Sequence, residues 1–585
     1  MKKYFIFFAV LPVIAAACSQ KDVLPAEEPQ EQIIQEEEQQ PAATVVYIEA
    51  KGDDTKAAIS GTDGSFSWSA GDQIAVYAGG YKLSDGLATG GAASATFAFS
   101  GDNVLNEADR ADFAVFPASL VFDGTSVRSG SASNHSASAL TVTLPASYNL
   151  ADVQGDNFPV PMIAANAPNG GLAFKNICAL LRVTVNNVPK DTRRIEFDFG
   201  GKKVQGEFTL TGVTAGETAA VTSSTAGADD IITVLTPGFD TFGNLTVSLP
   251  VPTGVASSQE YTDVVITSYD AATGGHKINA ITTPVKASGA WVPGRTSARR
   301  LTANLPVFSV AADKKVVFAP GNLQATLSEA VYTVTKSGSS DLGTQFWGAS
   351  AWAFAANQYT AIGNTAANTL ANPATGDIVD LYSWVGESIT QKTWWQDGCK
   401  YGILKVVRTG GTSTFCGSTY GEALVYDWGQ IMDSVPAEAY HLLSNAEWGY
   451  LLSTRTVSDN YVKVVLDNSI NGLIIFPDQY THPLGTSFSN ENTADASFST
   501  NAISLEDWVK LENAGCVFLP ATGTRDYSSG NVILNEDDLF YWSSTSRPSK
   551  SAQIYALQVT DSALNASALL ARYTGCAVRL VRDVN

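Results

Sequence analysis

The residue types that most often carry catalysis are thinly spread along this chain. Its four histidines, His135, His276, His441 and His482, lie far apart, and neither HExxH nor GxSxG occurs. Those two spacings hold a zinc ion beside its general base, or a serine nucleophile at a sharp turn. The sequence therefore contains no pattern for hydrolytic chemistry, and we expect neither enzyme activity nor a cofactor.

The cysteines give no metal or redox pattern either. Beside Cys18 there are five, and no CxxC pair occurs among them. Without a CxxC pair, the support for a cysteine metal site or a dithiol redox site is weak. Because five is an odd number, at least one thiol is free, and Cys178 in an apolar strand is the candidate.

The amino terminus has the order of a lipoprotein signal peptide. Lys2 and Lys3 precede an apolar run, Tyr4 to Ile14, that is too short to span a bilayer of about 30 Å. Ala15-Ala16-Ala17-Cys18 follows and resembles a bacterial lipobox, although Ala15 stands where Leu is commoner. The resemblance implies lipidation of Cys18 and removal of residues 1–18; ordinary signal cleavage is the alternative.

The charge pattern describes a tether and excludes one class of partner. Residues 19–44 are rich in Glu, Gln and Pro, so they cannot bury enough apolar surface to fold and are expected to be a disordered, extended tether. The net charge of the whole chain is −21. Without a basic cluster, the chain is not expected to bind nucleic acid.

Residues 45–305 predict a β region. Short apolar or alternating stretches separated by Gly, Asp, Asn and Ser are typical of antiparallel sandwiches. The predicted strands are Thr44–Ala50, Gln73–Tyr77, Phe113–Phe116, Ala179–Val185, Ile195–Phe199, Leu245–Leu249 and Val264–Thr267.

This region resembles the fimbrillin-like proteins of Bacteroidetes. The pattern is carried by Thr55-Lys56-Ala57, Phe66 to Tyr77 around Trp68 and Gly71-Asp72, Phe116-Pro117-Ala118, Leu172 to Leu181, and Leu249-Pro250-Val251-Pro252. The acidity of the tether also resembles the export signal of surface lipoproteins in that group. The family implies two transthyretin-like β-sandwiches, which we expect in residues 45–170 and 171–305.

Such pilins polymerise by strand exchange with other fimbrial subunits, through strand addition at an open sheet edge. In the family a protease removes the first strand by cutting after Arg or Lys. Here the first strand would be Val45 to Ala50, and Lys51 and Lys56 follow it in a loop where cutting is sterically easy. The alternative is that both lysines are solvated loop charges.

Residues 306–585 have a different composition, since nine of the eleven tryptophans lie there. Ser444 and Glu447 form a capping-box pattern before Trp448, and Ser504 precedes a second short helix, Leu505–Leu511. Strands are predicted at Val307–Val310, Lys315–Leu323, Gly472–Asp478, Cys516–Pro520, Phe540–Ser544, Ile554–Val559 and Cys576–Arg582.

This half resembles a Bacteroidetes surface module with a C-type-lectin-like fold. The matching stretches are Asn471 to Asp478, Val517 to Arg525, Tyr541 to Thr545 and Val578 to Asp583. The resemblance implies an α+β ligand-binding domain in residues 306–585. In relatives that vary their ligand surface, the variation lies between the last two of these stretches.

We therefore expect the ligand surface on the loops of residues 525–575. Tyr and Arg offer contact area, hydrogen bonds and stacking for a glycan or a protein ligand. The candidates are Arg525, Asp526, Tyr527, Asn531, Arg547, Tyr555, Asn565, Arg572 and Tyr573. Each could instead be an ordinary surface side chain, and Trp542 is expected in the core.

The lectin-like resemblance also bears on the cysteines and on calcium. It brings the strands of Cys516 and Cys576 close together and makes them a candidate disulfide or contact pair; Cys399 and Cys416, which flank a strand and a Gly-rich turn, are a second. The sugar-binding motifs of calcium-dependent lectins are absent, so the acidic run Asn535–Asp538 is read as a solvated turn and no metal is expected. The Arg-Gly-Gly-Ser-type stretch of the fold's formylglycine-generating members is missing as well.

Three functions remain open from the sequence. The leading one is a lipidated fimbrial adhesin on the outer membrane surface, a pilus tip subunit whose lectin-like domain occupies the end where a shaft pilin keeps its donor strand. The second is a stand-alone glycan-binding surface lipoprotein that does not polymerise. The third is an oxidase-like enzyme with the lectin fold.

Overall fold

The computed structural model describes most of residues 44–584, in stretches separated by gaps. It leaves out residues 1–43, and the longest gaps within the rest are 124–139, 286–298, 363–373, 385–403 and 407–427. Residues 44–585 form one unit. The protein is mainly β, in line with the fold class expected from the sequence. No helix of the described residues is long and apolar enough to cross a membrane.

The first sheets of the chain pack face to face and enclose a shared core. A five-stranded sheet has the order β12-β11-β7-β4-β5, with bounds Lys175–Asn176, Met162–Ala165, Phe113–Phe116, Ala75–Tyr77 and Tyr81–Leu83. A four-stranded sheet has the order β16-β15-β9-β8, with bounds Ala220–Ser224, Gly206–Thr211, Leu140–Leu144 and Val121–Asp123. Val115 and Ile163 of the first sheet pack with Val142 and Phe208 of the second.

The other face of the five-stranded sheet is covered by Trp68 and by β6 (Ala95–Phe99). The Trp68 ring meets the rings of Phe97, Phe116 and Phe174 edge to face, with centroid distances of 5.1, 5.1 and 5.6 Å. This geometry is favourable for aromatic pairs. The first strand of the chain, β1 (Thr44–Ile48), pairs antiparallel with β6, from Thr44 opposite Phe99 to Ile48 opposite Ala95.

A second pair of sheets encloses the largest core of the N-terminal half. One has the order β10-β17-β14-β19-β20, with bounds Ser147–Asn149, Ile231–Leu235, Arg194–Asp198, Asp263–Tyr269 and Lys277–Pro284. The other has the order β18-β13-β21, with bounds Gly243–Pro252, Cys178–Val188 and Arg299–Asn304. In β14 and β17 buried and partly exposed residues alternate, as expected for strands with one face on a core.

The expected boundary at residue 170 is crossed by strand pairing. β15 pairs with β9, and β17 pairs in parallel with β10, so strands after residue 170 pair with strands before it. The helix α1 spans Leu150–Val153. The division into domains at residues 170 and 305 stays a prediction.

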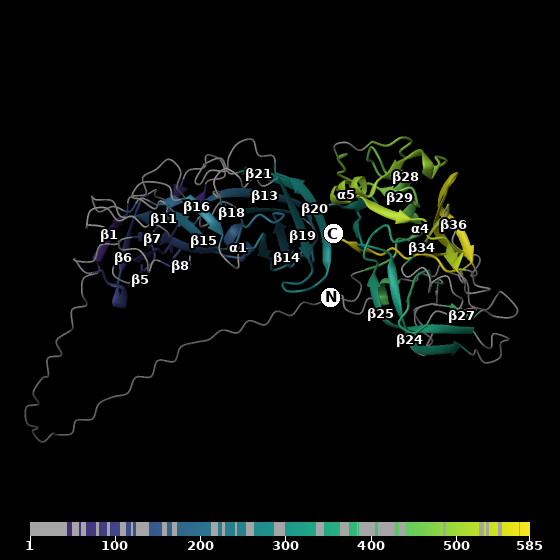
Figure 1. The fold of residues 1–585 in the computed structure, drawn as a ribbon, viewed down its shortest axis with the longest axis horizontal. Coiled ribbons are helices and arrows are strands. Elements are labelled where there is room, and N and C mark those ends of the chain that lie inside the picture. Colours follow the sequence, from purple (N-terminus) through teal and green to yellow (C-terminus); the bar gives the residue numbers. More distant parts are fainter. Residues whose placement is uncertain are drawn as a thin grey trace, which may run out of the picture. The chain divides into compact units, whose positions relative to one another are not determined.

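The C-terminal half (residues 306–585) is built from several small sheets (Figure 1). Three have the orders β22-β23-β37, β26-β24-β25-β27 and β30-β28-β29-β31; β32-β33 and β34-β35-β36 complete the set. In the first sheet, β22, β23 and β37 span Phe308–Ser309, Lys315–Phe318 and Val581–Asp583. In the second, β26, β24, β25 and β27 span Ile378–Val379, Leu323–Val334, Thr344–Phe354 and Leu404–Val406. In the third, β30, β28, β29 and β31 span Ala502–Ile503, Tyr461–Leu466, Ile470–Ile475 and Val517–Pro520. The bounds of the last two are Thr524–Arg525 and Val532–Ile533; and Leu539–Ser546, Gln553–Thr560 and Ala563–Ala571.

Both predicted helices of this half are confirmed with their caps. In α4 (Asn445–Gly449) the Glu447 amide donates to Ser444 Oγ at 3.2 Å, and the Ser444 amide donates to the Glu447 carboxylate at 2.7 Å. A π-helical turn, Tyr450–Thr454, continues it. Ser504 caps α5 (Leu505–Asn513), whose Trp508 and Leu511 pack on β28, β29 and β31.

Contacts between strands of the two halves are both apolar and ionic. Ile278 of β20 packs with Val307, Val317 and Val584 in one buried cluster. Arg582, which is 2% exposed, donates from Nη1 to Asp270 Oδ2 at 2.9 Å. A buried ion pair of this kind does not by itself add stability, but losing one partner is costly.

Candidate functional site

The last strand, β37, is held on both sides by other parts of the C-terminal half. On one side it pairs antiparallel with β23, with Val316 opposite Asp583 and Phe318 opposite Val581. On the other side Val581 and His441 exchange two main-chain hydrogen bonds, of 2.8 and 2.9 Å. Val584, beyond the strand, is fully buried. The strand is therefore an integrated part of this half.

Arg579 lies just before β37 and holds the segment that leads into this strand. Its side chain is fully buried and donates to the carbonyl oxygens of Ala319 at 3.1 Å, Gln358 at 3.3 Å and Phe518 at 2.7 Å. Guanidinium groups suit such sites because their donors point in fixed directions. Burial lowers the pKa of Arg579, and the neighbouring Tyr541 acts in the opposite direction.

A charged network joins β37 to the start of α4. His441 Nε2 lies 2.8 Å from Asp583 Oδ1, and its Nδ1 lies 3.0 Å from the Leu442 carbonyl oxygen. Lys314 Nζ bridges Glu447 Oε1 at 2.8 Å and Asp583 Oδ1 at 3.3 Å. Burial opposes the imidazolium, but the hydrogen bond and charge of Asp583 outweigh it and raise the pKa of His441 above 6.5. With an acceptor at each ring nitrogen, the doubly protonated ring is the form this site fits.

This network predicts a pH-dependent contribution to stability. Because the pKa of His441 is higher in the folded than in the unfolded protein, its contribution is fully present below pH 6.5 and is lost as the pH rises through the folded pKa. Urea unfolding of the protein and of His441→Gln should show a stability difference that is larger at pH 6 than at pH 8. Taking the difference between the two proteins removes groups that titrate in both. A difference that stays constant or grows with pH would contradict the charged form of His441.

Three of the predicted ligand residues share the exposed face of the sheet β34-β35-β36. Tyr555 of β35 lies opposite Leu569 of β36, and Gln558 lies opposite Asn565. Along β36 the residues at 563, 565, 567 and 569 are all exposed, which places them on one face. Arg547 follows β34, and its Nη1 donates to Gln553 Oε1 at 2.7 Å. The structure thus brings Arg547, Tyr555 and Asn565 onto one surface.

Arg525 lies inside the C-terminal half. It is 2% exposed, its Nη2 donates to the Asp380 carbonyl oxygen at 2.8 Å, and its Nε donates to the Leu381 carbonyl oxygen at 3.3 Å. Burial lowers the pKa of Arg525 to about 10, against the opposing charge of Asp380. The side chain holds two segments of this half together and does not belong to the exposed face of β35 and β36. The remaining ligand candidates, Asp526, Tyr527, Asn531, Arg572 and Tyr573, lie outside the described residues.

Cys516 and Cys576, expected as a disulfide or contact pair, form no disulfide. Both are free, and they belong to different cores: Cys516 lies beside Trp508 and Phe518, and Cys576 lies with Trp384 and Trp542. Burial raises the pKa of both thiols well above the usual range, so neither is a ready nucleophile. Cys178 is free and buried as predicted, whereas Cys18, Cys399, Cys416, Lys51 and Lys56 lie outside the described residues.

Two other predictions concern local environments. Trp542 is fully buried, as expected, and its Nε1 donates to the Tyr382 carbonyl oxygen at 2.6 Å. Within the acidic run, Asp537 is exposed and accepts a hydrogen bond from Asn471 Nδ2 at 3.2 Å. The network around His441 could not be predicted from the sequence, because its members Lys314 and Asp583 are far apart along the chain and no local pattern connects them.

Comparison with known proteins finds only distant likeness. No protein-family model and no curated protein matches the sequence. Among solved structures, candidate cell adhesion proteins from Bacteroides uniformis and Bacteroides ovatus are 17% and 14% identical, each with a TM-score of 0.23, over 43% of this chain and 89% of theirs. The tip fimbrial protein Mfa3 from Porphyromonas gingivalis, with a C-terminal truncation, is 10% identical with a TM-score of 0.16, over 43% of this chain and 83% of its own. TM-scores this low do not establish a common fold.

Proposed function

We propose that this chain is a surface-exposed fimbrial adhesin that ends a fibre and presents its C-terminal half to a glycan or protein ligand. The observation that carries the tip assignment is the position of β37. A shaft subunit gives a strand to its neighbour. Here both sides of β37 are used within the chain, so releasing it would break the pairing with β23 and the contacts of Arg579.

The first strand suits the opposite role, that of accepting a strand. β1 pairs with β6 over five residues, and in the described part of the chain these two strands form a sheet of their own. Removing β1 after Lys51 or Lys56 would leave the β6 edge unpaired above the buried rings of Phe97 and Phe99. A strand from another subunit could then pair there by main-chain hydrogen bonds.

The proposed ligand surface is the exposed face of β35 and β36 with Arg547. Tyr555, Asn565 and Arg547 combine an aromatic ring, an amide and a cation within one face, and Leu569 beside them is 38% exposed. Such mixtures of rigid aromatic and adaptable polar groups serve polar ligands well. Lipidation of Cys18, with the acidic segment after it as a tether, would hold the chain at the outer membrane until cleavage after Lys51 or Lys56 separates it from this anchor.

The test is to trim the protein with trypsin and mix it with a shaft pilin from the same organism. Size-exclusion chromatography with light scattering should show one-to-one complexes that grow no further. The variant with both Lys51→Gln and Lys56→Gln should resist trimming and stay monomeric in the mixture. Ladders formed by the trimmed protein alone would contradict the tip role. Absence of any complex would favour the stand-alone surface lipoprotein.

A further inference from the structure

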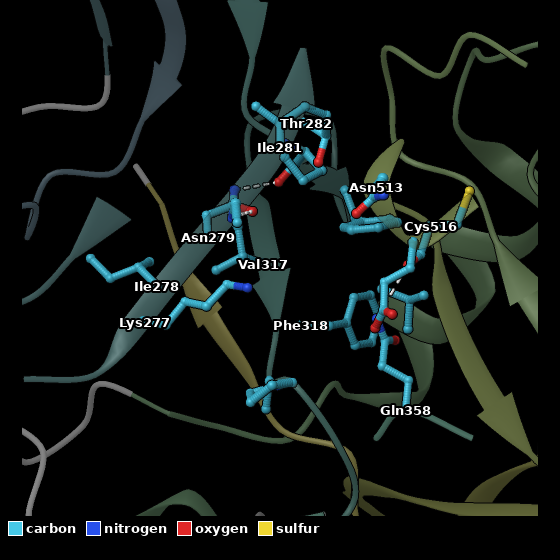
Figure 2. Close-up of a pocket in the computed structure, with 18 of the residues that line it drawn as sticks. Lys277, Ile278, Asn279, Ile281, Thr282, Val317, Phe318, Gln358, Asn513 and Cys516 are labelled. Carbon is cyan, nitrogen blue, oxygen red and sulfur yellow. Dashed lines mark hydrogen bonds between the residues drawn. The ribbon is translucent and has the colours of Figure 1, made fainter. Parts of the chain in front are cut away.

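A cavity of 310 Å³ lies where β20 approaches β23 and the end of α5 (Figure 2). Its lining includes three runs of consecutive residues, 277–282, 317–320 and 515–517. Its volume is at the lower end of the range of small-molecule sites, about 300–1,000 Å³. The cavity therefore has room for a small ligand, and much of its wall is main chain.

The β20 wall is the edge of a sheet. In the described part of the chain β20 ends its sheet and pairs only with β19. Asn279 stiffens this edge, since its Oδ1 accepts from the Ala280 amide at 2.9 Å and its Nδ2 donates to the Pro306 carbonyl oxygen at 2.6 Å. The strand's other outward main-chain groups are of the kind that pair with an extended amide chain.

Two opposite charges line the same cavity without pairing with each other. In Figure 2 the Lys277 ammonium points into the space between β20 and Phe318. No ion pair joins Lys277 to any carboxylate in the part of the chain that the structure describes. Glu512 accepts a hydrogen bond from Gln358 Nε2 at 3.0 Å and keeps capacity for further donors. Lys277 is an exposed residue, partial loss of solvent around it lowers its pKa, and the Glu512 charge opposes this.

Another part of the wall is apolar. Val317, Phe318, Ala319 and Pro320 follow one another along it, and Phe318 is 9% exposed. An aromatic ring in the same cavity as a cation and a carboxylate can support the body of a ligand whose ends are charged.

We propose that this cavity binds a short peptide with free termini, whose carboxylate lies beside Lys277 and whose ammonium lies beside Glu512. The peptide's amide groups pair with the outer edge of β20, and its body rests against Phe318. One end contacts β20 and the other contacts α5, so binding links these two elements. This site is separate from the exposed face of β35 and β36, and its test does not depend on the fimbrial role.

Isothermal titration calorimetry of the full chain with triglycine tests the proposal. Triglycine should bind, and N-acetyl-triglycine amide, which lacks both charges, should bind at least about tenfold more weakly. Lys277→Met and Glu512→Gln should each weaken triglycine binding by a similar factor. The matched controls Lys82→Met and Glu506→Gln, whose side chains lie outside the cavity lining, should bind like the parent protein.

The exchanged variant, Lys277→Glu with Glu512→Lys, gives the sharpest test. It keeps one cation and one carboxylate in the cavity, so a ligand charged at both ends can bind in the reverse direction and affinity should largely return. A ligand held by one charge alone would not recover. The proposal is overturned if triglycine does not bind the parent protein, if the blocked peptide binds equally well, or if the exchanged variant fails to regain binding while its unfolding curve matches the parent's.

Discussion

Replacing Trp542 with alanine should lower the free energy of unfolding by about 4 kcal/mol, because deletion of a fully buried tryptophan leaves a large cavity. The ring packs with Trp384, Trp428 and Cys576, and its hydrogen bond to Tyr382 holds a strand to a distant segment. Urea unfolding followed by tryptophan fluorescence measures the loss. The signal reports mainly on the C-terminal half, since eight of the ten remaining tryptophans lie there.

Trp542→Phe is the matched control for that substitution. It keeps most of the buried volume and loses the hydrogen bond to Tyr382, so a loss of about 1–2 kcal/mol is expected. If alanine costs no more than phenylalanine, Trp542 does not fill the core as the structure has it.

Arg579→Met should lower the free energy of unfolding by about 3 kcal/mol. The methionine can fill the space, but it leaves the carbonyl oxygens of Ala319, Gln358 and Phe518 without their donor. Buried acceptors that lose a partner cost about 1–3 kcal/mol each, partly offset here because a buried charge is also removed. Calorimetric and urea unfolding of the full chain give the value.

Two further variants, Arg579→Lys and Arg300→Met, distinguish the loss of the guanidinium hydrogen bonds from a general effect of removing an arginine. Lysine keeps the charge but cannot reach three acceptors in the fixed directions of a guanidinium, so its effect should be intermediate or equal to that of methionine. Arg300 is exposed, and its substitution should lower stability less than that of the buried Arg579. A methionine variant as stable as the parent would mean that water replaces the guanidinium.

Local patterns predicted the elements of this protein well. The capping box at Ser444 and Glu447 depends on residues three positions apart, so the sequence contains everything needed to predict it. The strand Phe113–Phe116 was predicted with its observed bounds, and the burial of Trp542 follows from its place in an apolar strand. Such features require no knowledge of which distant segments meet.

Features that depend on distant partners were missed or misjudged. Arg525 looks like a surface residue in its local context, but carbonyl groups about 145 positions earlier supply acceptors for its buried guanidinium. Cys516 and Cys576 were both predicted in apolar strands, yet the two segments join different cores and neither cysteine lies in a strand. Lys277 and Glu512 line one cavity only because β20 and α5 come together in the folded chain. Periodicity and composition carry no information about these contacts between distant segments.

The contacts around Val584 and Arg582 have a mechanical consequence. If tension were applied between the N-terminal sheets and the ligand surface, the short connection at residues 305–307 could not be stretched by itself. The buried cluster of Ile278, Val307 and Val584 and the bond from Arg582 to Asp270 would have to separate first. Because β37 carries Arg582, the same force would also load the antiparallel ladder with β23. The two halves should therefore resist a pull together and yield in one cooperative event.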